Sequence, residues 1–188
     1  TGVRIDIIDG AEEASIIAST DISSLIQKDK DYLYIDVGGG STEFTVFSKG
    51  KVKKSRSFPI GTVRLLDNKV SNKTWEEVEH WIKKHTKDCE HIEAIGSGGN
   101  INKIHKNSNS REGEPLSYQY LTDYLNYVSG FTYDERIRLL GFNPDRADVI
   151  LYALTVFINA MKWSGAEIVH VPRIGLADGI VRSIYNEE

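Results

Sequence analysis

Three consecutive glycines connect two expected strands, residues 32–37 and 43–48, and constrain the fold more than any other feature of this chain. Glycine approaches a ligand closely and adopts positive φ without steric cost. The N–H groups of such a turn, with the hydroxyls that follow it, can cradle phosphate oxygens. The loop residues predicted to bind phosphate are Gly38, Gly39, Gly40, Ser41 and Thr42.

Two carboxylates flank this glycine loop, because Asp36 ends the first strand and Glu43 opens the second. A carboxylate at the end of an apolar strand is costly unless it is solvated or paired. Carboxylates and water are ligands that Mg²⁺ accepts beside phosphate. Asp36 and Glu43 are therefore predicted magnesium ligands. The alternative is a plain hairpin turn, although a hairpin built for stability typically uses Asn-Gly or Asp-Gly.

The order of the expected elements indicates an α/β fold in a single domain. Residues 32–37, 43–48 and 51–58 predict a three-strand antiparallel meander, and single strands at 91–95 and 168–171 alternate with helices. This order predicts a mixed sheet with helices on both faces.

One expected helix covers residues 145–163. Its apolar residues occupy most of the helix circumference, which indicates a buried central helix. Thr74, Ser117 and Asp145 are the expected N-caps of three helices, and Glu77 would complete a capping box with Thr74. The expected helical segments are 12–24, 60–70, 75–85, 101–106, 118–129, 133–140, 145–163 and 176–185.

A second glycine cluster, residues 96–100, follows the strand at 91–95 and precedes a helix. Amides at a helix N-terminus bind anions, and the helix macrodipole assists. A tight strand–helix turn would have a similar composition, so this cluster is informative mainly because it accompanies the first. Its predicted phosphate-binding residues are Ser97, Gly98, Gly99 and Asn100.

Two adjacent glutamates open the first expected helix. With Asp9 as N-cap, Glu12 falls at the third helical position and can close a capping box. Glu13 has no such duty, and a carboxylate near a bound phosphoryl group could orient or deprotonate water. Glu13 is therefore the candidate catalytic residue. The alternative is an acid that only stabilises the helix N-terminus.

Cationic side chains supply two further signals. Arg64 lies early in a short helix, where the macrodipole does not favour a cation, so it is a predicted phosphate contact, with a plain surface arginine as the alternative. The expected strand at 51–58 is basic. It reads either as an edge strand protected by lysine or as a track for a long polyanion. Its cations are Lys51, Lys53, Lys54 and Arg56, with Lys49 just before it.

The composition of the chain limits the kinds of binding partner that we expect. The net charge of −4 supplies no overall polycation, so no nucleic-acid partner is expected. Cys89 is the lone cysteine, which excludes an intrachain disulfide and fits a reducing, cytoplasmic location. No apolar stretch is long enough to cross a membrane, so no membrane partner is expected either.

Taken together, these motifs resemble the exopolyphosphatase/guanosine pentaphosphate phosphohydrolase family, part of the actin-like, sugar kinase and heat-shock ATPase fold group. The glycine loop alone would also fit a heat-shock ATPase, whereas the upstream Glu-Glu-Ala and Glu43 are more particular to the phosphatases. The matching segments, in family order, are 9–14, 36–43, 61–64, 96–100, 146–150 and 175–180.

The resemblance implies a ribonuclease-H-like domain, as in actin-like ATPases, whose relatives hydrolyse a terminal phosphoanhydride with Mg²⁺. It implies that Glu13 activates water, that Asp36 and Glu43 lie near the metal, and that both glycine clusters hold phosphate. Family members often carry threonine where Ser97 and Asn100 stand. They also often carry Arg-Glu where this chain has Ala-Asp at 177–178, which bears on substrate preference more than on fold.

The resemblance covers only the second of two related domains in the family. Full members open with a strand and an Asp-x-Gly-Ser loop, which nothing in this sequence matches. We therefore expect residues 1–188 to be one domain, the C-terminal half of a two-domain core whose N-terminal domain is a required partner. Half a cleft lacks cationic and amide donors, so we expect the isolated chain to be inactive or nearly so. A homodimer is a further expectation, since relatives are often dimers.

Three functions fit these residues. The leading one is a phosphoanhydride hydrolase that acts on inorganic polyphosphate or guanosine pentaphosphate, and the expected partners are polyphosphate and guanosine penta- or tetraphosphate. The second is a non-catalytic sensor that binds a phosphorylated nucleotide through the glycine loops, and the third is an ATP-dependent kinase or chaperone module of the same fold. The residues themselves do not choose between polyphosphate and guanosine pentaphosphate.

Overall fold

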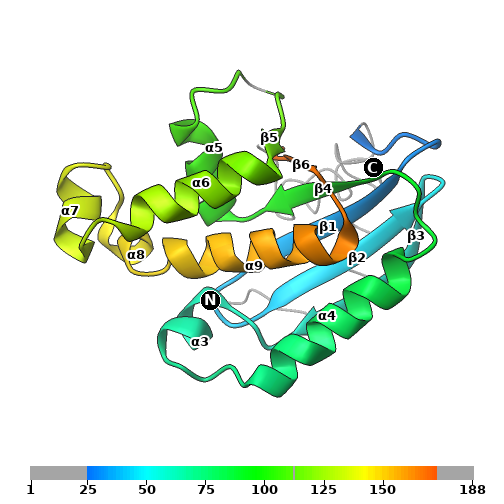
Figure 1. The fold of residues 1–188 in the computed structure, drawn as a ribbon, viewed down its shortest axis with the longest axis horizontal. Coiled ribbons are helices and arrows are strands. Elements are labelled where there is room, and N and C mark those ends of the chain that lie inside the picture. The colour runs from blue at the N-terminus through cyan, green and yellow to red at the C-terminus, as the bar shows by residue number, and fades with distance from the viewer. Residues whose placement is uncertain (1–24, 112, 173–188) are drawn as a thin grey trace, which may run out of the picture.

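The computed structural model describes residues 25–111 and 113–172, which form a six-stranded mixed sheet with helices packed against it (Figure 1). The strand order is β3-β2-β1-β4-β6-β5. The first three strands form an antiparallel meander, β4 runs parallel to β1, and β6 runs parallel to β4. The strands are β1 (Asp31–Val37), β2 (Thr42–Ser48), β3 (Lys51–Phe58), β4 (Ile92–Ser97), β5 (Leu116–Ser117) and β6 (Ile168–His170). The predicted α/β fold and meander are confirmed.

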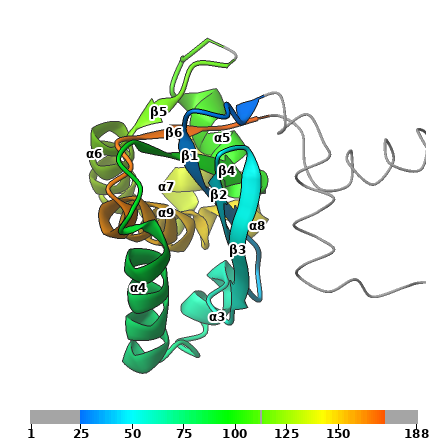
Figure 2. The same cartoon turned by 90° about the vertical axis from the view of Figure 1, so that its right-hand side faces the viewer.

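The long helices of the described residues pack on one face of the sheet. Helix α9 lies against β1 and β4, with α4 on one side and α6 on the other (Figure 1). Figure 2 shows α4 and α9 on the same side of the sheet. The helices expected over 12–24 and 176–185 lie outside the described residues. The helices are α3 (Thr62–Leu66), α4 (Asn72–Thr86), α5 (Gly99–Asn107), α6 (Tyr118–Ser129), α7 (Tyr133–Arg138), α8 (Pro144–Ala147) and α9 (Ile150–Ser164).

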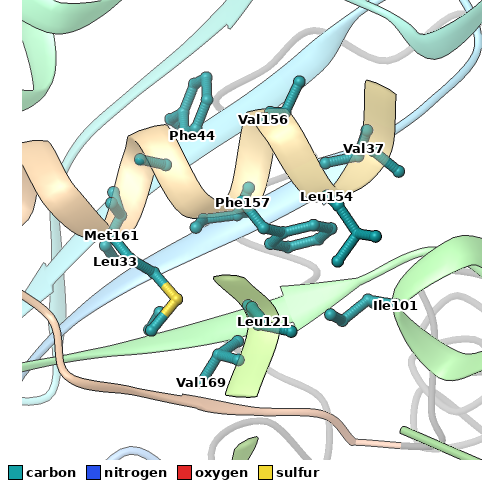
Figure 3. Packing of buried hydrophobic residues seen from close by; sticks show 14 of the residues in the cluster. Leu33, Val37, Phe44, Ile101, Leu121, Leu154, Val156, Phe157, Met161 and Val169 are labelled. Atoms are coloured by element: carbon teal, nitrogen blue, oxygen red, sulfur yellow. The ribbon is translucent and has the colours of Figure 1, made fainter. Parts of the chain in front are cut away.

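The main core lies between α9 and the sheet. Leu154, Phe157 and Met161 of α9 are fully buried and pack with side chains from β1, β2, α5, α6 and β6 (Figure 3). Burying one such side chain contributes about 1.5–3 kcal/mol. The predicted central, buried helix is thus confirmed. The partners shown are Leu33, Val37, Phe44, Ile101, Leu121 and Val169.

The opposite face of the sheet carries a smaller apolar cluster. Alternate residues of a strand point to opposite faces, so Tyr32 and Tyr34 turn away from α9 while Leu33 turns toward it. Phe47 and Ile95 complete this second cluster. The same alternation continues to Asp36, which therefore projects on the face of the two tyrosines.

The predicted N-caps are partly wrong. Ser71, not Thr74, caps α4, and its hydroxyl accepts from the Thr74 amide at 3.2 Å. Residues 72–74 fit the first helical turn, so the helix begins earlier than the apolar pattern indicates. The predicted cap Ser117 is confirmed, since its hydroxyl accepts from the Tyr120 amide at 3.0 Å.

The helix expected over 145–163 is two helices. Asn143 is the N-cap of the short α8, Asp145 lies in its first turn, and α9 begins only at Ile150. The Val149 amide bonds back to the Arg146 carbonyl at 3.1 Å, a tight turn that ends α8. The prediction of Asp145 as the cap of one long helix is therefore wrong.

Within residues 25–111 and 113–172, no helix combines the length and the apolar character that a membrane crossing needs.

Candidate active site

Asp36 and Glu43 lie directly opposite each other on the antiparallel strands β1 and β2. Opposite residues of such a pair point to the same face, with Cβ atoms about 4.5–5.5 Å apart. Burial raises the pKa of Asp36, and the charge of Glu43 raises it further, while hydrogen bonds from Ser97 and Tyr34 act in the opposite direction. The Tyr34 hydroxyl donates to Asp36 Oδ2 at 3.4 Å. The two carboxylates thus form a close, partly buried pair.

Two hydroxyls hold Glu43 in place. Ser41 Oγ and Ser57 Oγ each donate to Glu43 Oε1 at 2.7 Å. Ser57 belongs to β3 and directly faces Glu43 across the meander. In the part of the chain that the structure describes, Glu43 Oε2 has no donor. One oxygen of Glu43 is therefore anchored and the other can bind a ligand.

The Asp36–Glu43 pair has the donor chemistry of a magnesium site. Mg²⁺ is usually held by one or two carboxylates, with waters and substrate phosphates completing its octahedron. No group of three or more His, Cys, Asp or Glu side chains suited to a metal occurs among the described residues. A divalent cation at this pair would offset the repulsion between the carboxylates and would rely on water and phosphate for its other ligands. The assignment of these ligands stays a prediction.

Helix α3 holds the glycine loop in place through backbone hydrogen bonds. The Gly38 and Gly39 carbonyls accept from the Thr62 and Val63 amides, both at 3.0 Å. The Gly38 amide donates to the Ser41 carbonyl at 3.0 Å. Within the described residues, the amides of Gly39 and Gly40 have no acceptor. The loop carbonyls are therefore occupied, while two amides are available to an anion.

Close packing of two backbones explains Gly61, which the sequence analysis did not single out as a site residue. A Cβ at Gly61 would collide with the backbone of Gly39 and Gly40. A glycine at this point lets α3 approach the loop closely enough to bond its carbonyls. A signal was present in the sequence, because Gly61 opens one of the family-matching segments.

Arg64 is turned toward the glycine loop. Its Nε donates to the Gly40 carbonyl at 2.7 Å. No carboxylate of the described chain pairs with it, so its two terminal nitrogens remain for another acceptor. The structure therefore places Arg64 beside the glycine loop, and its role as a phosphate contact stays a prediction.

The hydroxyl of Thr42 is buried and makes a structural hydrogen bond. Thr42 is fully buried, and its Oγ1 donates to the Ile60 carbonyl. This bond ties the start of β2 to the segment that leads into α3. Thr42 was predicted to bind phosphate, and the structure leaves no free hydroxyl there to do so.

The second glycine cluster meets the first at the end of β1. Parallel pairing of β1 and β4 places Ser97 beside Asp36. Gly98 has φ +108°, and a Cβ there would lie 3.1 Å from the Val37 carbonyl oxygen and 3.5 Å from Asp36 Oδ1. Only glycine adopts such a φ readily. The two predicted phosphate loops therefore converge on one point.

Helix α5 begins at Gly99, and its N-cap is Gly98. Within the described residues, no side chain caps its N-terminal amides. Asn100, predicted to bind phosphate, carries a buried Oδ1 that finds no partner among the described residues. Backbone amides at the positive end of a helix can bind an anion, so the phosphate role of this cluster stays a prediction.

Arg146 opens the family-matching segment 146–150, but the sequence analysis did not single it out as a candidate site residue. A Cβ at Gly99 would lie 2.6 Å from both Arg146 Nη1 and Nη2, so the guanidinium covers the start of α5. A cation at a helix N-terminus is unfavourable without an anion between them. No carboxylate of the described chain lies within 4.0 Å of Arg146. A cavity of about 410 Å³ beside it is also lined by Lys103 and Lys106.

Glu13, the predicted catalytic residue, lies outside the described residues, as does the family-matching segment 175–180. The structure thus brings together Asp36, Glu43, Arg64 and both glycine loops, and it adds Gly61, Ser57 and Arg146.

Known proteins resemble this chain along its whole length. A model of the Ppx/GppA phosphatase family matches residues 1–188. A bifunctional 3-dehydroquinate synthase/phosphatase from Fusobacterium nucleatum is 27% identical over 194 residues, which cover 91% of this chain and 29% of that protein. The chain therefore spans less than a third of the length of this curated relative.

Solved structures show the same fold. A Ppx/GppA phosphatase from Aquifex aeolicus superposes with a TM-score of 0.74 at 23% identity, covering 92% of this chain and 62% of that one. An exopolyphosphatase from Cytophaga hutchinsonii superposes with a TM-score of 0.76 at 20% identity, covering 96% and 65%. The predicted actin-like ATPase fold is therefore confirmed. With a family match over its full length, this chain belongs to the Ppx/GppA phosphatase family.

Proposed function

We propose that this chain is the second domain of a phosphoanhydride hydrolase that releases the terminal phosphate of inorganic polyphosphate or guanosine pentaphosphate. The observation that carries the proposal is the convergence of the Asp36–Glu43 pair and both glycine loops at the ends of β1 and β4. Family membership supports a phosphatase. The exopolyphosphatase from Cytophaga hutchinsonii, a relative in fold, makes polyphosphate the first substrate to test.

The described residues would bind the phosphates and oppose their charge. The amides of Gly39 and Gly40, which have no acceptor within the described residues, and the guanidinium of Arg64 would face one phosphoryl group. The α5 amides and Arg146 would hold the next phosphate along the chain. Donors that are fixed before the reaction stabilise developing charge without reorganisation, and phosphoryl transfer depends chiefly on such positioning.

Asp36 and Glu43 would hold Mg²⁺, each through a carboxylate oxygen that faces the loops. When bound, the metal supplies neutralisation of phosphate charge. Ser41 and Ser57 keep Glu43 oriented, and Tyr34 and Ser97 do the same for Asp36.

Glu13 would act on the attacking water. Its carboxylate takes a proton from water as the water oxygen bonds to the terminal phosphorus, and the bond from that phosphorus to the bridging oxygen breaks. The products are inorganic phosphate and a substrate shortened by one phosphate.

The other wall of the cleft would come from a preceding domain of the same protein. The related structures are longer than this chain, which covers 62% and 65% of two of them. We infer that residues 1–188 alone bind phosphate but turn over slowly or not at all, because the reacting group stays open to water. A homodimer and a cytoplasmic location belong to the same proposal, the latter because Cys89 is a free thiol.

Phosphate release by the full-length parent protein tests the function. Polyphosphate, guanosine pentaphosphate and ATP are compared with and without Mg²⁺. We expect Mg²⁺-dependent release from at least one of the first two and little from ATP. Calorimetric binding of guanosine pentaphosphate without turnover would instead identify a sensor, and ATP use that requires an acceptor would identify a kinase.

A further inference from the structure

A cavity of about 420 Å³ lies where helices α4 and α9 pack against each other on the helical face of the sheet (Figure 1). Pockets for small ligands and side chains of this kind have volumes of about 300–1,000 Å³. None of its lining residues belongs to the glycine loops or to the carboxylate pair. We call this cavity the tryptophan pocket, and its lining residues include Asn72, Trp75, Glu76, Glu79, Asn159 and Trp163.

Two indole rings line the tryptophan pocket together, one from each helix. Trp75 and Trp163 meet edge to face, with ring centroids 6.0 Å apart and ring planes at 65°. Both rings pack partly against the main core, yet each is only half-buried. Edge-to-face pairing engages the π face of only one ring of a pair. Tryptophan binds a cation over its face better than any other side chain, and no cation of the described residues lies over either ring.

The charged side chains that line the pocket are both acidic in the part of the chain that the structure describes. Glu76 has no ion-pair partner there. Glu79 pairs with Lys83 at 2.5 Å through Oε1 only, and Lys83 does not itself line the pocket. An exposed pair four residues apart on a helix contributes little to stability, so Glu79 can exchange this partner for a better one. The pocket therefore has the charge that attracts a cation.

Carboxylates beside indole rings favour a guanidinium over an ammonium group. A guanidinium is planar, stacks on aromatic faces and donates two parallel hydrogen bonds to one carboxylate. An ammonium group is compact and strongly hydrated, so it loses more water when it lies against a ring. The ligand that fits Glu76, Glu79 and the two tryptophans is thus a guanidinium on an apolar stem.

Further polar groups of the pocket match a peptide backbone. Among residues 25–111 and 113–172, neither indole N–H has an acceptor, and the side-chain amides of Asn72 and Asn159 have no partner. Tryptophan N–H groups that are partly buried usually find an acceptor. A bound peptide supplies carbonyl acceptors for these donors and N–H donors for the amide oxygens.

We propose that the tryptophan pocket binds an arginine side chain of a partner polypeptide. The guanidinium pairs with Glu76 and Glu79, its stem lies against an indole ring, and the neighbouring peptide groups bond the asparagine amides and the indole N–H groups. This interaction is separate from the phosphatase site, and none of its steps needs phosphate.

Indole NMR on the chain 1–188 tests the inference, with acetyl-Gly-Arg-Gly-amide as the probe. We expect the peptide to shift the Nε1–H resonances of Trp75 and Trp163. The third tryptophan, Trp81, is only 5% exposed and does not line the pocket, so its resonance should stay in place. The same peptide with citrulline keeps the shape and loses the charge, and its Kd should be at least about fivefold higher.

Removal of the two carboxylates supplies a second readout. In E76Q/E79Q we expect the Kd of the arginine peptide to rise about fivefold and the preference over citrulline to disappear. The matched control E90Q/E167Q removes two exposed carboxylates outside the pocket and should leave both unchanged. The comparison of the two peptides in the wild type needs no substitution, so it holds even where a variant is poorly folded.

Butylguanidinium separates the two possible sources of the cation. Binding weaker than that of the arginine peptide is expected, because the free compound makes no backbone contacts. Equal affinity would overturn the assignment to a polypeptide and assign the pocket to a small guanidino compound. Equal binding of the arginine and citrulline peptides, shifts confined to Trp81, or an unchanged Kd in E76Q/E79Q would overturn the inference as a whole.

Discussion

Asp36 and Glu43 face each other from adjacent strands, and the charge of Glu43 adds to burial in raising the pKa of Asp36. The folded domain therefore binds a proton at Asp36 more tightly than the unfolded chain does. Its stability falls as the pH rises from the unfolded pKa through the raised folded pKa. At neutral pH the two carboxylates are held close together, which lowers the folding stability of the domain. Such a cost is expected where both residues serve to bind a ligand.

Replacing Asp36 by Asn should stabilise the ligand-free chain at pH 7, because it removes a buried charge beside a second carboxylate. We expect the Tm to rise on the order of 2–4 °C, the change that about 1 kcal/mol produces in a chain of this size. The gain should shrink as the pH falls below the raised pKa. Thermal melts from pH 4 to 8 measure it, with the exposed D88N as control. A gain that is independent of pH would show that the carboxylate charge is not its cause.

Mg²⁺ should stabilise the wild-type chain and not E43Q. A ligand at ten times its Kd stabilises the folded state by about 1.4 kcal/mol. Melts with Mg²⁺ in the presence of inorganic phosphate measure this shift. D88N should respond as the wild type does, and an equal Mg²⁺ response in E43Q would place the metal elsewhere.

Replacing Gly61 by Ala should destabilise the chain, because the new Cβ meets the backbone of Gly39 and Gly40. Overpacking of this kind costs about 1–3 kcal/mol. Circular-dichroism melts should show a clear fall in Tm. G40A is the matched control in the same loop, since a Cβ at Gly40 meets nothing within 4 Å. Equal Tm values for the two variants would contradict the close approach of α3 to the loop.

Replacing Arg64 by Gln should weaken phosphate binding without unfolding the loop. A charge-assisted hydrogen bond that is lost on this change should reduce kcat/KM of the full-length parent about 10- to 100-fold. R138Q removes an exposed arginine from α7 and should leave kcat/KM unchanged. If R64Q retains full activity, its bond to Gly40 is purely structural.

Replacing Glu13 by Gln should abolish turnover by the full-length parent and spare substrate binding. General base catalysis contributes about 10²- to 10⁴-fold, so kcat should fall by that factor while the Kd for polyphosphate stays the same. E12Q is the control, because Glu12 has a capping role in our reading. Retained turnover in E13Q would assign the base to another residue.

The features predicted correctly from sequence are those that depend on near neighbours. The meander and the loop at Gly38–Gly40 follow from alternation along short strands and from consecutive glycines. The cap Ser117 follows from a single side chain before an apolar run. Each signal lies within a few residues of the structure that it specifies.

The features that were missed depend on partners far along the chain. Ser57 reaches Glu43 because β3 pairs with β2 in one register, and Arg146, in the short helix α8, covers Gly99 at the start of α5. No local pattern carries the contact of Ser57. Arg146 opens the family-matching segment 146–150, but nothing near it in the sequence places it beside Gly99. Thr42 shows the same limit. Its hydroxyl donates to the carbonyl of Ile60, and no local pattern in the sequence predicts that the two residues are in contact.

The parallel pairing that sets Ser97 beside Asp36 has a consequence for how substrates are told apart. The two glycine loops follow the adjacent, hydrogen-bonded strands β1 and β4. The distance between them is therefore fixed by the sheet. Under the proposed function, this domain would hold its phosphate-binding groups at a fixed spacing. Adjustment to different phosphate chains would then come from the proposed preceding domain, and differences in substrate choice among relatives should map to that domain.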